Sequence, residues 1–432
     1  MIKRSKKSPR HIERRNSKNI LKHIHLTKLQ PHSYKNCLGT VLDTNYDAGF
    51  IVDQVDPLDA AQFRSSKSSG LETKTVVNDN IISAKEVRAA HKGWTDALVS
   101  ISQTNKKKGI EAAKALAGDV IDGAYAYQLG AVAFKPTWAS GDSSFRTTRE
   151  GAVSYFVGDN DNFDDLGYAI GNKPDPVTGE RSAWKKAWFD RSVMRLDGNT
   201  ATVQGFMYTK DEDGNVGYVD KTWSYQKDDE GTVRIVLHHS SSPYVSVDDP
   251  DELKNRKVDN RGFDPANQIK RKEVKAAQKA WTNALVSISQ TYKDEGFDAA
   301  KSLAGDVIDG AYDYQVGPVA FKPTWASGST TFRTGRRGAV SYFIGGDKRF
   351  EDTGFGIGNK PDPDTGKRSP WKKAWTENAV IRLDGDTATS MGWMYSKDED
   401  GNVSKVDKTW TWRKDDDGNL RIVVHHSSTP YG

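Results

Sequence analysis

The sequence predicts an α+β protein made of two tandem cone-shaped domains, each with helices packed on a curved antiparallel sheet. Residues 85–244 align with residues 272–431 at a constant offset of 187, without a gap and with 110 identities in 160 positions. Each repeat begins with apolar residues at helical spacing and continues with short β-rich runs between turns. A repeat of about 160 residues has the size of a complete domain and exceeds a solenoid unit. The predicted organisation is a basic leader (1–83), a first repeat (84–244), a polar linker (245–271) and a second repeat (272–432).

The first third of each repeat is expected to be helical. Ser83 and Glu86 form a capping box, with Ser at the N-cap and Glu three residues later. The apolar residues that follow lie on one helical face: Val87, Ala90, Trp94, Ala97, Leu98 and Ile101. A second helical stretch, roughly residues 109–127, is expected to close over the sheet.

The remainder of the repeat reads as strands. The β-rich runs are Ala152 to Val157, Ser192 to Leu196, Ala201 to Lys210, Val219 to Lys227 and Arg234 to Ser240. The last three are joined by turns at Asp213-Gly214 and Glu230-Gly231. The tryptophans at a helical spacing of four are expected to pack in a core rather than to stack on a ligand: Trp184 with Trp188, and Trp371 with Trp375. A sheet curled around a helix leaves a conical cavity at one end.

Composition excludes several classes of site. Cys37 is the only cysteine, so one chain can form neither a disulfide framework nor a thiolate metal site. The net charge of +5 is too small to imply a nucleic-acid partner, and no stretch approaches 18 apolar residues.

The first 37 residues are basic and contain one acid, Glu13, which is typical of an organelle transit segment. We therefore expect a plastid or its surrounding endomembrane compartment, with a nucleic-acid-binding arm as the competing interpretation of the leader.

Histidine is scarce enough to limit the chemistry. Of nine histidines, only the pairs His238-His239 and His425-His426 occur in both repeats, because Gln278 replaces His91. Neighbouring residues of a strand point to opposite faces, so each repeat can direct one histidine into its cavity. Catalytic zinc needs three converging ligands, which makes a zinc enzyme improbable. Oxygen ligands for a harder ion such as Mg or Mn stay open.

Alternation along the last strand leaves two arrangements. Ile235, Leu237, His239 and Ser241 share one face, and Val236, His238 and Ser240 share the other. We favour the first as the cavity wall because Ile235 and Leu237 bring more apolar bulk. The alternative function of this block is structural, with histidine and serine satisfying backbone groups at the strand end. Lys135 and Arg146 could attract an anion, although exposed basic side chains are usually just solvated.

Three segments together resemble a known family. The His-His-Ser-Ser-x-Pro block, the Lys-Pro-Thr-Trp segment at 135–138 and the Ser-Tyr-Phe run at 154–156 are similar to those of the iota-class carbonic anhydrases of algae and bacteria. The units of that class are related to the association domain of calmodulin-dependent kinase II. The resemblance covers both repeats and implies a cone of the nuclear-transport-factor type and the reversible hydration of CO₂ to bicarbonate. Members are described both as metal-free and as manganese-dependent, and we expect no cofactor here.

The resemblance also implies site residues. Metal-free members use a threonine and a tyrosine 18 positions apart, as Thr137 and Tyr155 are, together with a histidine and a serine two apart. The implied catalytic set is Thr137, Tyr155, His239 and Ser241 in the first repeat and Thr324, Tyr342, His426 and Ser428 in the second. The alternative facing uses His238 with Ser240 and His425 with Ser427. Hydroxyl groups would donate to the developing carboxylate, and histidine would orient water or relay its proton.

Two other classes of function stay open at this point. Kinase-type association domains use the same cone to assemble rings, so the chain could be an oligomerising or anion-binding module without catalysis. Related cones also house isomerases and dehydratases, which need a carboxylate beside the histidine, and no acid shared by both repeats lies in the His-His-Ser-Ser segment. The expected partners are CO₂ and bicarbonate, with the two repeats paired inside one chain and further assembly into a homo-oligomer.

Overall fold

The computed structural model describes residues 81–158, 160–244, 257–261 and 268–431. The expected leader lies almost entirely outside these residues, as does most of the linker. In the first repeat the main elements are α1 (Ala84–Lys108), α2 (Ile110–Ala124), β1 (Ala133–Lys135), α3 (Arg149–Val157), β2 (Trp184–Asp197), β3 (Thr200–Asp211), β4 (Val216–Lys227) and β5 (Val233–Ser241). The second repeat repeats them as α4 (Arg271–Glu295), α5 (Phe297–Ala311), β7 (Ala320–Lys322), α6 (Arg336–Ile344), β8 (Trp371–Asp384), β9 (Thr387–Asp398), β10 (Val403–Lys414) and β11 (Leu420–Ser428).

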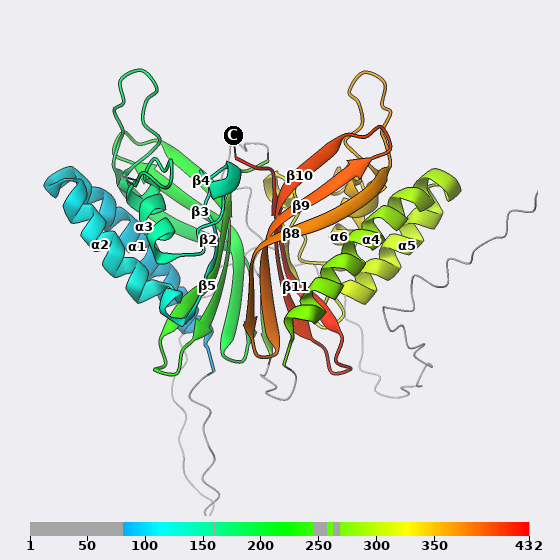
Figure 1. The fold of residues 1–432 in the computed structure, drawn as a ribbon, viewed down its shortest axis with the longest axis horizontal. Helices are drawn as coiled ribbons and strands as arrows, with labels where there is room; N and C mark the ends of the chain where they lie inside the picture. The colour runs from blue at the N-terminus through cyan, green and yellow to red at the C-terminus, as the bar shows by residue number, and fades with distance from the viewer. Residues whose placement is uncertain (1–80, 159, 245–256, 262–267, 432) are drawn as a thin grey trace, which may run out of the picture. The chain divides into compact units, whose positions relative to one another are not determined.

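Each repeat forms one sheet with helices on a single face, so the predicted α+β class is confirmed (Figure 1). The strand orders are β1-β5-β4-β3-β2-β6, in which β6 spans Lys257–Arg261, and β7-β11-β10-β9-β8. The long strands form the predicted antiparallel meander, and the short β1 and β7 run parallel to β5 and β11. Strand β6 (Lys257–Arg261), within the expected linker, pairs in parallel with β2. None of the helices in the described part of the chain is long and apolar enough to cross a membrane.

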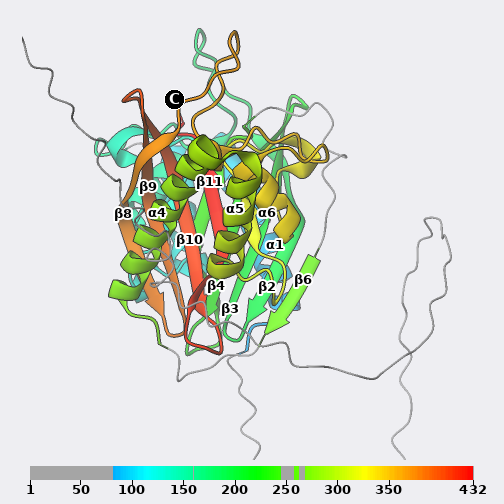
Figure 2. The same cartoon turned by 90° about the vertical axis from the view of Figure 1, so that its right-hand side faces the viewer.

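Helix α1 begins and packs as its sequence predicts. Ser83 accepts a hydrogen bond from the backbone N–H of Glu86, and Glu86 accepts one from the backbone N–H of Ser83, which completes the capping box. Trp94, Leu98 and Ile101 are buried on the side that meets the sheet. Figure 2 shows the equivalent helices of the second repeat, α4, α5 and α6, lying over their sheet. We call this helix-covered side of each sheet the inner face and the opposite side the outer face.

Two local predictions are wrong. Ala152 to Val157 is part of helix α3, not a strand, and Thr148 caps its N-terminus through a hydrogen bond from Gly151. A short apolar run that is buried on nearly every side has no periodicity that separates helix from strand. Trp184 and Trp188 belong to strand β2, not to a helix. Trp184 packs in the core, as expected, whereas Trp188 lies beyond a bulge at Lys185 and packs against Tyr208 in a separate cluster.

The outer faces of the two sheets pack against each other. Ala133 and Leu237 of the first repeat form a buried cluster with Val380 and Met391 of the second. A second cluster contains three counterparts with the repeats exchanged, Ala320, Val424 and Val193, together with Val423. The repeats therefore pair within one chain with approximate twofold symmetry, as expected. Association of whole chains stays a prediction.

Candidate active site

A β-bulge in the last strand decides which histidine faces the helices. In the pairing of β5 with β4, Leu237 lies opposite Ser224 and Ile235 lies opposite Tyr225, so Val236 has no partner of its own. An extra residue of this kind reverses the alternation of side chains beyond it. Strand β11 carries the same irregularity at the matching position.

The bulge corrects the predicted orientation of the histidines and serines. His238 and Ser240 lie on the inner face, and His239 and Ser241 lie on the outer face, where they contact the second repeat. The expectation that His239 and Ser241 line the cavity is therefore wrong, and the alternative facing is the one that the structure adopts. In the second repeat His425 and Ser427 are likewise inner, and His426 and Ser428 are outer.

His238 is held by partners on both ring nitrogens. Its Nδ1 lies 2.7 Å from the hydroxyl of Tyr125, which also accepts a hydrogen bond from Trp94 Nε1 at 3.0 Å. Its Nε2 lies 2.8 Å from Nζ of Lys221. Phe134 stacks on the ring at 4.4 Å between centroids and 16° between planes. The imidazole is therefore fixed in position and is 1% exposed.

The direction of these hydrogen bonds indicates a neutral lysine. Trp94 Nε1 can only donate, so Tyr125 accepts from it and donates its own proton to Nδ1 of His238. The proton of the imidazole then sits on Nε2 and is donated to Lys221 Nζ, which must accept through a lone pair. The opposite direction would leave the buried hydroxyl of Tyr125 without an acceptor, at a cost of about 1–3 kcal/mol.

Burial favours the same protonation states. Desolvation lowers the pKa of Lys221 well below its ordinary value, and no carboxylate forms an ion pair with it in the described part of the chain. The pKa of His238 is also well below 6.5, because of burial first and the positive charge that Lys221 would carry second. Aromatic rings surround the amine, with Trp94 at 5.0 Å, Trp223 at 5.3 Å and Tyr168 at 6.0 Å from their centroids to Nζ.

Three hydroxyl groups converge beside this network. Thr137 Oγ1 and Ser240 Oγ lie 2.5 Å apart, and both side chains are 1% exposed. The hydroxyl of Tyr155 is buried without a hydrogen-bond partner, although Thr137 and the backbone of Trp138 are near enough to oppose the rise that burial causes in its pKa. Tyr155 stacks on Tyr168 with 5.6 Å between ring centroids. The predicted Thr137, Tyr155 and Ser240 are thus brought together, with one donor left free.

The second repeat reproduces this geometry. His425 lies 2.8 Å from both the Tyr312 hydroxyl and Lys408 Nζ, and Phe321 stacks on it at 4.4 Å. Thr324 and Ser427 are 2.6 Å apart, and the hydroxyl of Tyr342 is again buried without a partner. The two sites therefore have the same donors and the same stacked imidazole.

The outer histidines belong to the contact between the repeats. His239 Nδ1 lies 2.7 Å from Thr409 Oγ1, and its Nε2 lies 3.1 Å from Ser428 Oγ. His426 makes the reciprocal contacts with Thr222 at 2.7 Å and Ser241 at 3.0 Å. All four partners are buried, so these residues join the repeats and do not line either cavity.

Lys135 and Arg146, which were expected to be solvated, are buried and form ion pairs. Lys135 Nζ lies 2.9 Å from Asp407 Oδ2 of the second repeat, and Lys322 makes the reciprocal pair with Asp220 at 3.0 Å. Arg146 pairs with Asp165 at 2.6 Å. Within residues 81–431, as far as they are described, no three His, Cys, Asp or Glu side chains form a group that could hold a metal ion.

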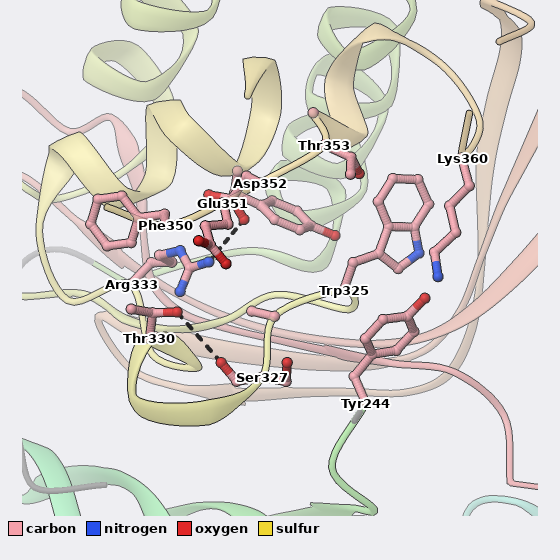
Figure 3. A pocket seen from close by; sticks show the side chains of 13 residues that line it. Tyr244, Trp325, Ser327, Thr330, Arg333, Phe350, Glu351, Asp352, Thr353 and Lys360 are labelled. Atoms are coloured by element: carbon pink, nitrogen blue, oxygen red, sulfur yellow. Dashed lines mark hydrogen bonds and ion pairs between the residues drawn. The ribbon is translucent and has the colours of Figure 1, made fainter. Parts of the chain in front are cut away.

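A pocket of about 240 Å³ reaches the second site (Figure 3). Tyr342, Trp325 and Arg333 line it together with Lys360 and, from the first repeat, Tyr244. Arg333 donates to Asp352 at 2.8 Å through Nη2, whereas its Nε and Nη1 have no partner in the structure. The pocket therefore connects the tyrosine of the site with two cationic side chains.

Sequence reasoning missed Lys221 and Tyr125. Lys221 lies between Val219 and Trp223 on the inner face of β4. The available signal was a single charged residue among the apolar residues of a buried strand face. Tyr125 follows helix α2, where neither spacing nor a motif points toward the last strand. Both have identical counterparts in the second repeat, Lys408 and Tyr312.

Comparison with known proteins gives the family. The model of the metal-independent carbonic anhydrases matches residues 85–242 and again 272–429. A metal-independent carbonic anhydrase of Nostoc sp. is 52% identical over 195 residues, which are 45% of this chain and 88% of that protein. The crystal structure of an iota-carbonic anhydrase from a cyanobacterium, complexed with bicarbonate, is 50% identical and covers 38% of this chain and 95% of its own, with a TM-score of 0.35. A putative calcium/calmodulin dependent protein kinase II association domain from Xanthomonas campestris is 19% identical over 37% of this chain and 88% of its own, with a TM-score of 0.22. Because the family model covers both repeats, and so well over half of the sequence, the chain belongs to the metal-independent carbonic anhydrases.

Proposed function

We propose that each repeat hydrates CO₂ reversibly to bicarbonate at the group of hydroxyls on its inner face. The first site consists of Thr137, Tyr155 and Ser240, backed by His238 and Lys221. The second consists of Thr324, Tyr342, Ser427, His425 and Lys408. The observation that carries this assignment is the free hydroxyl of Tyr155, a buried donor with no protein partner beside two other hydroxyls.

The hydroxyls supply the electrostatic part of the catalysis. When water adds to the carbon of CO₂, one C–O bond forms, one C=O π bond becomes a negatively charged oxygen, and one proton leaves. Tyr155 can donate to that oxygen, and so can whichever of Thr137 and Ser240 is not donating to the other. These donors are already fixed in a buried site, so they stabilise the charge without reorganising.

Proton uptake falls to the pair of His238 and Lys221 acting together. Both nitrogens of His238 are occupied, so the imidazole alone has no free lone pair for the proton of the attacking water. Lys221 is a buried amine next to it that the hydrogen-bond directions hold neutral, and its one lone pair accepts from Nε2 of His238 at rest. The amine acts as the base when it turns that lone pair from the imidazole to the attacking water. Tyr125 acts as a positioning residue, because its hydroxyl sets the tautomer of His238.

No metal ion takes part in this proposal. The family is metal-independent, and the inner-face groups are hydroxyls, an imidazole and an amine, with no carboxylate among them. Water is therefore activated by position and by a neighbouring base, without a Lewis acid.

Stopped-flow CO₂ hydration by the full chain tests the assignment. Activity is expected before and after treatment with a chelator, and it is expected to persist when only one site is silenced, by Thr137→Val with Tyr155→Phe or by Thr324→Val with Tyr342→Phe. Silencing both sites should abolish it. Unchanged activity in the doubly silenced chain would show that the chemistry lies elsewhere.

We also propose that the chain works in a plastid or its surrounding endomembrane compartment. The support is the basic, acid-poor sequence of the first 37 residues, which lie outside the described residues. A fluorescent protein fused after residue 83 should enter the organelle, and a fusion lacking residues 1–83 should not.

A further inference from the structure

Each repeat ends in a Pro-Tyr dipeptide that the proposed chemistry does not use. Tyr244 follows strand β5 of the first repeat, yet it lines the pocket of the second site. Lys360 Nζ lies 4.2 Å from the centroid of the Tyr244 ring and 5.7 Å from that of Trp325. Figure 3 shows Lys360 reaching toward Tyr244 and Trp325 at the end of the pocket away from Arg333 and Asp352.

The first repeat shows the same contacts with the repeats exchanged. Lys173 Nζ lies 4.3 Å from the ring centroid of Tyr431, which follows β11 of the second repeat, and 5.8 Å from that of Trp138. A geometry that occurs twice, within about 0.1 Å, between segments 187 positions apart is a feature of the fold. In each case a lysine at one site is held by a tyrosine that belongs to the other repeat.

The charges of the pocket indicate what it binds. Lys360 is exposed and has no ion pair with any described carboxylate, so its ammonium can meet a ligand. Arg333, 1% exposed, brings two N–H donors that have no partner. Of the two acids in the lining, Asp352 is already paired with Arg333, and Glu351 is exposed. Cation–π contacts hold a cation without neutralising it, so Lys360 keeps its charge for an anion.

We propose that Lys360 and Lys173 bind product bicarbonate at the mouths of the two sites, each positioned by a tyrosine that the other repeat supplies. This rests on the proposed reaction, whose product is a small oxyanion released next to Tyr342 and Tyr155. Bicarbonate that forms at the hydroxyls is negatively charged, so it can bind the ammonium group of the lysine as it leaves the site. Uncharged CO₂ has no comparable attraction to that ammonium group. Tyr244 and Tyr431 act through the lysines and are positioning residues.

The test uses the full chain with its first site silenced by Thr137→Val and Tyr155→Phe, so that only the second site reports. The readout is the inhibition constant of bicarbonate during CO₂ hydration. The equilibrium constant fixes the ratio of kcat/KM for CO₂ hydration to kcat/KM for bicarbonate dehydration, so no substitution can change one of them alone. A residue that binds the product is therefore recognised by the affinity for bicarbonate. Lys360→Met is expected to raise the inhibition constant of bicarbonate about fivefold, because it removes a partly exposed, charge-assisted contact with the anion.

Tyrosine variants separate the two repeats. In the same background Tyr244→Ala should also raise the inhibition constant of bicarbonate. Tyr244→Phe, which keeps the ring, should retain most of the parent's affinity for bicarbonate. Tyr431→Ala, at the silenced site, should give the parent value. Lys367→Met is the matched control, because Lys367 is also an exposed lysine of the second repeat but does not line the pocket.

Two results would overturn the proposal. One is the parent inhibition constant in Lys360→Met, and the other is an equal effect of Tyr431→Ala and Tyr244→Ala. If the parent chain hydrates no CO₂, the proposed reaction fails separately. The bicarbonate dissociation constant, measured on the same chains by ¹³C line broadening, then still decides whether Lys360 and Tyr244 bind the anion.

Discussion

The imidazole rings of His239 and His426 lie parallel across the two repeats, with 3.7 Å between their centroids and 3° between their planes. Two protonated rings could not stack this closely in a buried site. Burial, helped by the charges of Lys135 and Lys322, holds the pKa of His239 well below 6.5. Burial lowers the pKa of His426 in the same way, so both rings of the stack are neutral near neutral pH.

Truncation of this stack should weaken the pairing of the repeats. His239→Ala removes a buried ring and leaves the hydroxyls of Thr409 and Ser428 without its nitrogens, so the free energy of unfolding should fall by about 2–4 kcal/mol. Urea unfolding followed by tryptophan fluorescence measures the change. One cooperative transition in the parent should separate into two in the variant, and a loss below about 1 kcal/mol would contradict the role assigned to the stack.

Acid should destabilise the fold below about pH 6.5. The pKa of His91 is lowered by burial to about 3, and the four histidines of the two final strands also have pKa values well below 6.5. The unfolded chain binds these protons first, so their contribution is complete above pH 6.5 and is lost as pH falls, by about 1.4 kcal/mol per pH unit for each histidine. Unfolding free energies measured between about pH 7.5 and pH 5 should show this slope.

His91→Phe is the matched variant for this effect. The Phe side chain keeps ring contacts with Phe189 and Trp223 but cannot be protonated. Below pH 6.5 the free energy of unfolding of His91→Phe should therefore change less steeply with pH than that of the parent, by the contribution of one proton. An unchanged slope would show that His91 does not remain neutral in the fold.

Much of the fold could be predicted from the sequence, but the facing of the site could not. Alternation and turn residues give the three-strand meander, and the capping box gives the start of α1. The facing of His238 and His239 depends on one unpaired residue, Val236, and a bulge there leaves no mark in an apolar run. Tyr244 reaches the other repeat's site only through the pairing of the domains, which no local pattern encodes.

Lys221→Met should separate activity from stability. Loss of the amine removes the proposed base, so CO₂ hydration by a chain with its second site silenced should fall by about 100-fold or more. The folded pKa of Lys221 is depressed, so its contribution to stability is complete above pH 10.5 and is lost as pH falls. The variant should therefore gain stability relative to the parent between about pH 10 and pH 7. A variant that lost activity only because it unfolded would show the opposite sign.

Tyr155→Phe with Tyr342→Phe should also reduce activity without destabilising the chain. Each hydroxyl is buried without a partner, so its removal deletes an unsatisfied group and should leave the free energy of unfolding equal or higher. Loss of one preorganised donor should lower kcat by about 100-fold to 1,000-fold. Unchanged CO₂ hydration would remove tyrosine from the mechanism.

The ion pair between Lys135 and Asp407 should respond to double substitution. Both side chains are essentially buried and belong to different repeats, and Lys135 Nζ also lies 3.4 Å from the backbone carbonyl of Ser240. Lys135→Met alone strands a buried carboxylate and should cost about 3–5 kcal/mol of the free energy of unfolding. Lys135→Met with Asp407→Leu replaces both charges by apolar groups and should recover most of that loss, measured by urea unfolding. If the double variant were as unstable as the single one, the lysine would be stabilising the fold through the Ser240 carbonyl and not through the carboxylate of the second repeat.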